Sequence, residues 1–476
     1  MENRISLNPL AVIPGAPARP VAPRTKMLLE APILPTLLRL SAPNVLNLLA
    51  IVGMVTFDAI FVGRLGPDAL AGVSLVFPWV MFMQHAAASG MGGGVSSAIA
   101  RALGSGQRGL ADALASHALA LAIILAAIAS AFMLLCGPLL YQLMGGQGAV
   151  LSAALAYSNV VFSGVIAIWA LNILANVVRG TGNMELPALV IIGSVLAHVL
   201  LSPALIFGWG PLPALGPAGA GWGLILSFGV GSIVLLARLR ASTALVTLAL
   251  RGVTLQWRLF SEILNVGIPG MLNVGITNLS VVILTGIAVH LGQETAIGYA
   301  MGARLEYILI PLAFGFGTAI VSMVGTNWGA KQFQRARQIA WTGGVTVALA
   351  CGSIGVFFAL FPQVWMGLFS EEQEIIRAGS SYLRIVGPIY AFYGLGMALY
   401  FATQGLGRVR ATVAANGVRL AVSACGGVFA VIWLDAGPVG FFVAIAVGFF
   451  VYGGLTACVL LRLIKPASAP EQDARP

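Results

Sequence analysis

Asp58 is an acidic residue inside a long apolar stretch, residues 36–62, where a charged side chain is costly. A carboxylate held away from water loses part of its preference for the ionised form, so it can take up a proton or a small cation near neutral pH. The chemistry expected here is the reversible neutralisation of one negative charge. The alternative is a hydrated Asp near the end of the stretch, because a turn at residues 63–66 follows closely.

Two polar pairs, each with four-residue spacing, also lie in apolar stretches. His198 and Ser202 fall on one face of a helix, as do Asn172 and Asn176. A histidine beside a carboxylate can share or relay a proton, whereas a histidine with a core hydrogen bond would have no such role. For the two asparagines the alternative is hydrogen bonding between helices.

The composition indicates where these residues are placed. The chain has 476 residues, of which 59% are hydrophobic and 8% charged, and its mean hydropathy is +0.96. Soluble domains carry about 25% charged residues, so most of this chain must lie in lipid. Membrane β-barrels show short alternating segments, whereas the apolar runs here are long and continuous. The sequence therefore predicts an all-α polytopic membrane protein.

Twelve apolar stretches are long enough to span a bilayer, which needs about 20 residues. They fall at residues 36–62, 69–100, 112–143, 150–178, 186–208, 216–238, 262–289, 296–328, 338–369, 378–403, 410–434 and 438–463.

Basic residues gather in the loops on one side of these stretches. That side carries Arg101, Arg108, Arg179, Arg238, Arg240, Arg251, Arg258, Lys331, Arg335, Arg337, Arg408 and Arg410. The opposite loops hold only Arg64 and Arg377. Because Lys and Arg stay in the cytoplasm, both termini are predicted to be cytoplasmic, in a bacterial inner membrane. This pattern also explains the net charge of +10, so a nucleic-acid partner is not expected.

The two halves of the chain resemble each other at an offset of about 225 residues. The predicted organisation is a disordered tail (1–34), an N-lobe (35–245), a C-lobe (246–465) and a second tail (466–476). Each lobe has six spans, so a pseudo-two-fold axis along the membrane normal should relate the lobes.

Pro43 and Pro269 occupy matching positions early in the first helix of each lobe. Proline removes a backbone donor and permits a bend, so both are candidate hinges, or else static kinks.

Several motifs resemble the multidrug and toxic compound extrusion (MATE) family, and in particular its prokaryotic DNA-damage-inducible branch. They are DAIFVGRLGPDALAG at 58–72, GVSSAIAR at 94–101, RGTGN at 179–183, RLE at 304–306 and GTNWGA at 325–330. The resemblance covers about residues 35–465. It implies two six-helix lobes in a V that work by alternating access. It also implies export of amphipathic organic cations in exchange for protons or sodium ions, with no cofactor or bound metal. A monomer is the default expectation.

The resemblance also assigns roles to the polar residues. It makes Asp58 the coupling carboxylate of the N-lobe, with Asn176 as a partner. The family's fifth helix often carries an Asn and an Asp where this chain has His198 and Ser202. Loss of that second carboxylate weakens a sodium site, and the histidine suits proton transfer, so proton coupling is favoured over sodium.

The C-lobe offers weaker candidates. Glu306 could pair with Arg304 or Arg419, or it could take part in transport. Family members with C-lobe coupling use acids on the seventh and tenth helices. Here those helices offer only neutral polar residues, among them Asn273, Asn278 and Tyr393, so coupling in this lobe is not expected.

Aromatic residues such as Phe57 and Phe61 suit an organic cation, although packing or lipid contact explains them equally. One alternative function is a flippase for lipid-linked oligosaccharides from the same superfamily, which would need a cationic site from Arg304, Arg384 and Arg419. Another is a membrane scaffold that transports nothing. No nucleotide-binding, metalloprotease or hydrolase motif is present, so an enzyme is not predicted.

Overall fold

The computed structural model describes residues 22–249 and 254–464. In this part of the chain, eleven helices are long and apolar enough to cross a membrane. Two shorter helices, Gly148–Ser163 and Ile166–Gly180, meet at 46° and together form a twelfth span. The predicted all-α, twelve-span architecture is confirmed. The tails at 1–21 and 465–476 lie outside the described residues.

The N-lobe contains the first six spans. Its helices are α2 (Ile33–Gly63), α3 (Pro67–His85), η1 (Ala86–Met91), α4 (Gly92–Gly104), α5 (Arg108–Leu143), α6 (Gly148–Ser163), α7 (Ile166–Gly180), α8 (Glu185–Phe207) and α9 (Pro217–Arg240). The π-helical turn η1 joins α3 and α4 into a single span, Pro67–Gly104.

The C-lobe contains the last six spans. Its helices are α10 (Trp257–His290), α11 (Gln293–Ala303), α12 (Glu306–Gly329), α13 (Phe333–Leu360), α14 (Pro362–Met366), α15 (Gln373–Val386), η2 (Gly387–Ile389), α16 (Tyr390–Gly405), α17 (Arg410–Ile432) and α18 (Gly437–Leu463).

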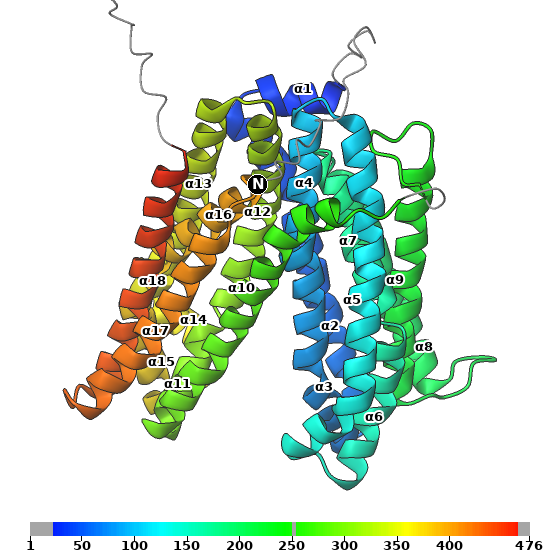
Figure 1. Cartoon of the computed structure of the whole chain (residues 1–476). Helices are drawn as coiled ribbons and strands as arrows, with labels where there is room; N and C mark the ends of the chain where they lie inside the picture. The colour runs from blue at the N-terminus through cyan, green and yellow to red at the C-terminus, as the bar shows by residue number, and fades with distance from the viewer. Residues whose placement is uncertain (1–21, 250–253, 465–476) are drawn as a thin grey trace, which may run out of the picture.

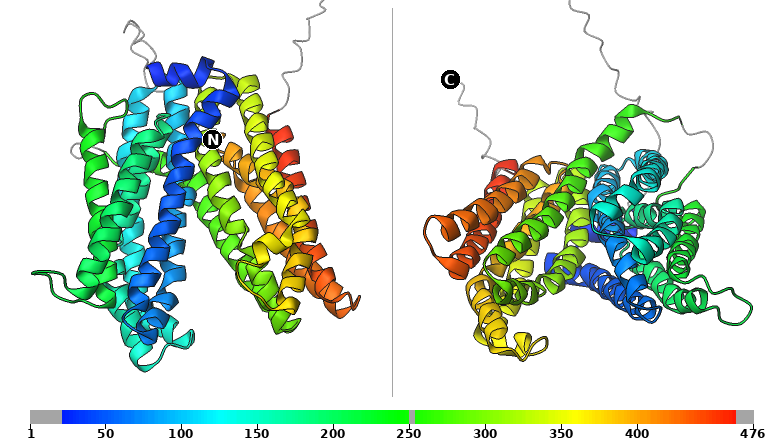
Figure 2. Two further views of the ribbon diagram at one scale, coloured as in Figure 1. Left: turned by 180° about the vertical axis from the view of Figure 1, so that it is seen from behind. Right: turned by 90° about the horizontal axis from the view of Figure 1, so that it is seen from below.

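The two lobes form a V. They meet at the end of the molecule where α1 lies and where α18 finishes, and they diverge toward the opposite end (Figures 1 and 2). The first helix of each lobe contacts both lobes: α2 packs against α8 and α12, and α10 packs against η1 and α17. These two helices are therefore placed to respond when one lobe moves against the other.

The contact between the lobes repeats the internal symmetry. Ser97 on α4 donates a hydrogen bond to the Gln404 carbonyl oxygen on α16, and Ser322 on α12 donates one to the Arg179 carbonyl oxygen on α7. The donors and the acceptors are each separated by the repeat offset of about 225 residues. The pseudo-two-fold axis expected from the sequence passes through this contact.

Two matching glycines allow this close approach. A Cβ at Gly104 would collide with the Thr326 carbonyl oxygen, and a Cβ at Gly329 would collide with the Arg101 carbonyl oxygen. Small residues of this kind let membrane helices pack backbone to backbone.

The prediction of disorder is wrong for the last part of the 1–34 segment. Residues Pro23–Glu30 form a short helix, α1, with a proline in its first turn. Leu28 is buried, and its carbonyl oxygen accepts a hydrogen bond of 2.9 Å from the Asn327 side chain. Contacts with the C-lobe therefore order a helix that is too short to be stable alone.

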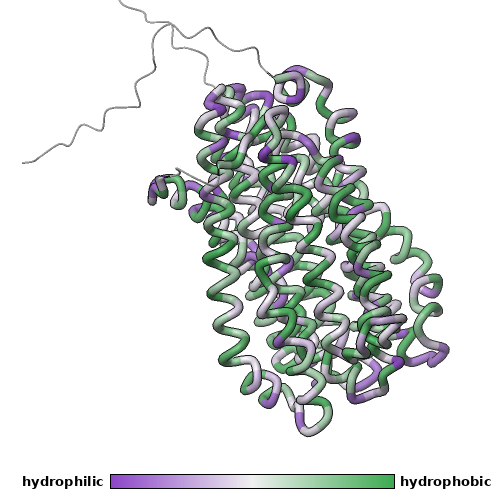
Figure 3. The backbone as a smooth tube through the Cα atoms, turned by 90° about the vertical axis from the view of Figure 1, so that its right-hand side faces the viewer, coloured by the Kyte–Doolittle hydropathy of each residue, from purple (hydrophilic) through white to green (hydrophobic). Residues whose placement is uncertain are grey.

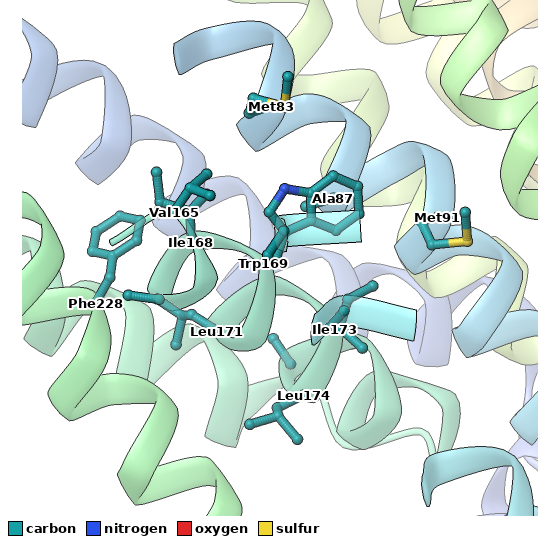
Figure 4. Close-up of a cluster of buried hydrophobic side chains, with 14 of the residues drawn as sticks. Met83, Ala87, Met91, Val165, Ile168, Trp169, Leu171, Ile173, Leu174 and Phe228 are labelled. Atoms are coloured by element: carbon teal, nitrogen blue, oxygen red, sulfur yellow. The ribbon is translucent and has the colours of Figure 1, made fainter. Parts of the chain in front are cut away.

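Apolar packing holds each lobe together. Figure 4 shows side chains of α7, including Trp169 and Ile173, packed toward Met83, Ala87 and Met91 of the second span. The outer surfaces are also apolar, with polar residues concentrated at the two ends of the helices (Figure 3). This distribution is the one a bilayer demands.

Candidate functional site

Asp58, His198 and Ser202 meet inside the N-lobe. The Nε2 atom of His198 lies 2.8 Å from Oδ1 and 2.9 Å from Oδ2 of Asp58. The Ser202 hydroxyl donates to Oδ1 at 3.1 Å. The Asp58 side chain is 21% exposed and that of His198 is fully buried. The carboxylate is thus partly withdrawn from solvent, with two polar neighbours.

Helix packing creates this meeting. Asp58 lies near the end of α2, which packs against α8. His198 and Ser202 lie one turn apart on α8, so both face α2. On its other side α8 packs closely against α9, because Gly223 of α9 has no side chain. A Cβ atom at residue 223 would lie 3.0 Å from the Ser202 Cα.

The geometry defines which groups can carry a proton. When Asp58 is ionised, Nε2–H of His198 donates to both carboxylate oxygens and Ser202 adds a second donor. Nδ1 of His198 is buried and has no hydrogen-bond partner among the described residues. With Nε2–H directed at Asp58, the free Nδ1 atom is the position on the ring that can accept a further proton.

The two asparagines lie in a different contact. Asn176 donates to the Ala88 carbonyl oxygen at 3.0 Å and to the Asn172 carbonyl oxygen at 2.9 Å, and Asn172 donates to the Ile168 carbonyl oxygen. No hydrogen bond within the described ranges joins either residue to Asp58. These contacts tie α7 to η1, as expected of asparagines that link helices.

Glu306 has a different environment from that expected. It begins α12 and accepts hydrogen bonds from the hydroxyls of Tyr382 (2.8 Å) and Tyr390 (3.5 Å). Neither Arg304 nor Arg419 forms an ion pair with it in the part of the chain that the structure describes. Arg304 lies over the ring of Phe369 at 5.3 Å instead. The proposed ion pair is therefore wrong, and two tyrosines take its place.

Arg419 belongs to a second polar cluster in the C-lobe. It donates to the Asn416 Oδ1 atom at 2.7 Å and to the Ser280 hydroxyl at 2.8 Å. Asn416 in turn donates to the Asn273 Oδ1 atom at 2.8 Å. This network joins α17 to α10.

The other C-lobe candidates are not brought together with Glu306 by hydrogen bonds. The Asn278 side chain is exposed and donates to the Val274 carbonyl oxygen of its own helix. Tyr393 is buried, with its ring 4.7 Å from that of Phe449.

The candidate hinges lie inside the two helices that contact both lobes, Pro43 in α2 and Pro269 in α10.

Sequence reasoning missed an ion pair between the lobes: the Arg101 guanidinium on α4 lies 3.3 Å from the Glu262 carboxylate on α10. Both residues lie near the ends of spans, where charged residues are common. Only the folded structure shows that these two residues, far apart in the sequence, form a pair.

Comparison with known proteins agrees with this architecture. A family model described as MatE matches residues 43–204 and 269–428, one segment in each lobe. A protein of Shewanella oneidensis named FAD transporter is 28% identical over 79% of this chain and 82% of its own length. A probable multidrug resistance protein NorM of Thermotoga maritima is 28% identical over 78% of this chain and 80% of its own.

A solved structure described as the outward-facing conformation of a multidrug resistance MATE family transporter superposes with a TM-score of 0.84. It is 25% identical and covers 93% of this chain and 98% of its own. The match in both halves, the two symmetric lobes and the twelve spans agree. The chain belongs to the MATE family of multi-pass membrane transporters and is not an enzyme.

Proposed function

We propose that this transporter exports amphipathic organic cations in exchange for protons. The observation that carries the proposal is the contact of Asp58 with His198 and Ser202 inside the N-lobe. It provides one negative charge that a proton can neutralise, beside a second group able to hold that proton.

The exchange follows from competition for this charge. An ionised Asp58 attracts a cation, and Phe57, next to it and 46% exposed, offers an aromatic face that suits an organic cation. Protonation of Asp58 removes the negative charge and weakens that attraction. Proton and cargo therefore favour opposite states of one carboxylate, which is the differential affinity that coupled exchange requires.

Protons are favoured over sodium by the donors around Asp58. A sodium ion wants several hard oxygen ligands, as hard cations generally do. Here the side chain of His198 approaches both oxygens of Asp58. It takes the place in which a second carboxylate could bind a sodium ion together with Asp58.

Lobe movement would expose the site to each side in turn. Both termini are inferred to be cytoplasmic in an inner membrane, so the lobes diverge toward the outside, in agreement with the outward-facing relative. We infer that Pro43 and Pro269 act as hinges, since their helices contact both lobes. A single chain contains both lobes, so a monomer suffices.

A second candidate cargo is an anionic flavin dinucleotide, because one relative of 28% identity is named FAD transporter. This cargo would not be attracted by an ionised Asp58 and would need a cationic surface. The three arginines considered for a lipid-diphosphate carrier do not gather into one: Arg304 lies over Phe369, Arg419 is bound to Asn416 and Ser280, and no contact among the described residues joins the exposed Arg384 to either.

Transport in proteoliposomes tests the proposal. The purified chain is reconstituted in sodium-free buffer, a pH gradient is imposed, and uptake of ethidium and of FAD is measured in parallel. Ethidium transport driven by the pH gradient alone is expected. A strict sodium requirement would overturn proton coupling, and FAD transport without ethidium transport would overturn the cargo.

A further inference from the structure

A cavity of about 580 Å³ lies at the end of the N-lobe where α1 is placed, far along the helices from Asp58. Three arginines from separate helices line it: Arg24 of α1, Arg108 at the start of α5 and Arg238 near the end of α9. The linker after α9, including Ala244, closes one side. Neither the exchange mechanism nor the contact between lobes uses this cavity.

Among the described residues, no carboxylate lines the cavity. Acidic residues on the neighbouring helices make other contacts: Glu30 lies 3.8 Å from Lys26, Glu185 lies 3.9 Å from Arg39, and Asp112, one turn after Arg108, accepts the Thr247 N–H at 2.7 Å. Three arginines in a lining that contains no described carboxylate favour an anionic ligand.

The cavity is already held in shape. Arg108 donates to the Ala244 carbonyl oxygen at 2.6 Å, and the Leu248 N–H bonds the Leu239 carbonyl oxygen at 3.0 Å. Val246 of the linker is fully buried. These contacts fasten the linker over α5 and α9, so a ligand would find a formed site.

The walls of the cavity are mostly apolar beneath the arginines. The larger apolar lining residues are Val178, Leu186, Leu239, Leu245 and Val246, and the neutral polar ones are Thr181, Asn183, Ser242 and Thr243. A small hydrated anion gains nothing from such walls, whereas an ester-linked headgroup with carbon atoms behind its phosphate can bury them. The ligand is therefore expected to be amphipathic.

An exposed apolar stripe on α9 leads away from Arg238 into the membrane. At successive four-residue steps it contains Val234, Val230, Leu226 and Trp222, with exposed fractions of 41%, 61%, 46% and 44%. With 3.6 residues per turn, each four-residue step shifts the side chain by about 40° around the axis, so the stripe winds around α9 as it leaves Arg238. A hydrocarbon chain could follow its first two steps, Val234 and Val230, below Arg238.

We infer that the cavity binds the headgroup of an anionic phospholipid whose acyl chains lie along α9. Arginines and apolar residues line the cavity together, and an exposed apolar stripe continues from it along α9. At a membrane surface, anionic lipids supply headgroups and chains that match these two features. Because the linker that connects the two lobes forms one wall, the bound lipid would also stabilise that linker.

Titration of the full chain with lipid tests this inference. In detergent, native mass spectrometry measures the apparent Kd for dioleoylphosphatidylglycerol and for zwitterionic dioleoylphosphatidylcholine. The variant Arg24→Gln/Arg238→Gln removes two charges and keeps the Arg108–Ala244 contact. It should weaken phosphatidylglycerol binding about 25-fold, since each basic residue near a membrane surface contributes about a factor of five. Phosphatidylcholine binding should hardly change.

A matched control removes two other exposed arginines of the same side, Arg240→Gln/Arg258→Gln, neither of which lines the cavity. In detergent these two arginines face no charged bilayer surface and no bound headgroup, so the control should alter phosphatidylglycerol affinity no more than about twofold, since a distant charge is screened by salt. Equal affinity in the cavity variant and the wild type would overturn the inference. The Tm is also measured with inorganic phosphate and with glycerol 3-phosphate. If either raises the Tm of the wild type as much as phosphatidylglycerol does, and leaves the Tm of the cavity variant unchanged, the ligand is a soluble phosphate and the inference is overturned.

Discussion

Each lobe has a partly buried carboxylate that is a candidate for coupling, Asp58 in the N-lobe and Glu306 in the C-lobe, and their partners differ in kind. Asp58 in the N-lobe faces His198 and Ser202, whereas Glu306 in the C-lobe faces the hydroxyls of Tyr382 and Tyr390. The two acids do not occupy equivalent positions of the internal repeat, because Asp58 lies late in the first span of its lobe and Glu306 within the second.

The difference bears on which carboxylate can exchange charge. An imidazole can take up or release a proton, so His198 can share the proton that Asp58 gains or loses. A tyrosine hydroxyl keeps its proton and serves as a fixed donor. We therefore propose that the N-lobe carries the coupling site, whereas the C-lobe carboxylate bonds α12 to α15 and α16.

The largest expected effect is that of Asp58→Asn. The amide keeps the shape of the side chain but cannot gain or lose a proton, so pH-driven ethidium transport should fall to the background of empty liposomes. Asp68→Asn, in the exposed first turn of α3, is the matched control and should transport normally. Residual coupled transport by Asp58→Asn would remove this carboxylate from the mechanism.

Replacement of His198 should have the next largest effect. In His198→Asn the carboxylate loses the imidazole that can take up and release a proton beside it. The transport rate should fall about tenfold, and its dependence on pH should change, because one of the two proton-exchanging groups is gone. His290→Asn, at the exposed end of α10, should leave both unchanged. An unmoved pH profile in His198→Asn would mean that the histidine only packs there.

A smaller effect in the same direction is expected for Ser202→Ala. The hydroxyl is buried and donates at 3.1 Å, but His198 still contacts both carboxylate oxygens. The rate should fall about fivefold, which corresponds to the loss of one net hydrogen bond of ~1 kcal/mol. Ser194→Ala, one turn before His198 on the same helix, bonds only to its own helix and should have no effect.

The smallest effect on transport is expected for Glu306→Gln. The amide oxygen still accepts the Tyr382 hydroxyl, so ethidium transport should stay within about twofold while the Tm falls by no more than a few degrees, for ~1 kcal/mol lost with the charge. Loss of transport as complete as that of Asp58→Asn, with normal expression, would place a coupling site in both lobes.

The sequence predicted those features that depend on local pattern. Hydropathy located the spans, and matching Gly and Pro residues in the two halves indicated a duplication, which the structure repeats in the hydrogen bonds of Ser97 and Ser322. Helical spacing placed His198 and Ser202 on one face. Their meeting with Asp58 joins helices that are far apart in the chain, and the family resemblance, not the spacing, suggested it.

The errors arose where tertiary contacts decide the outcome. Periodicity did not show that Asn176 faces η1, and charge alone suggested an arginine partner for Glu306, although tyrosines from α15 and α16 occupy that position. The short helix α1 was missed because its stability comes from Asn327 and the C-lobe, and not from its own residues. The cationic cavity was invisible for the same reason, since its three arginines are far apart in sequence.

Proton release on binding of cargo tests the central claim most directly. Ethidium is added to the purified transporter in weakly buffered, sodium-free detergent solution, and the change in pH is recorded near the pH at which transport is half-maximal. If cargo and proton compete for Asp58, the wild type should release up to about one proton per bound ethidium and Asp58→Asn should release none. Equal proton release from the two proteins would contradict the account.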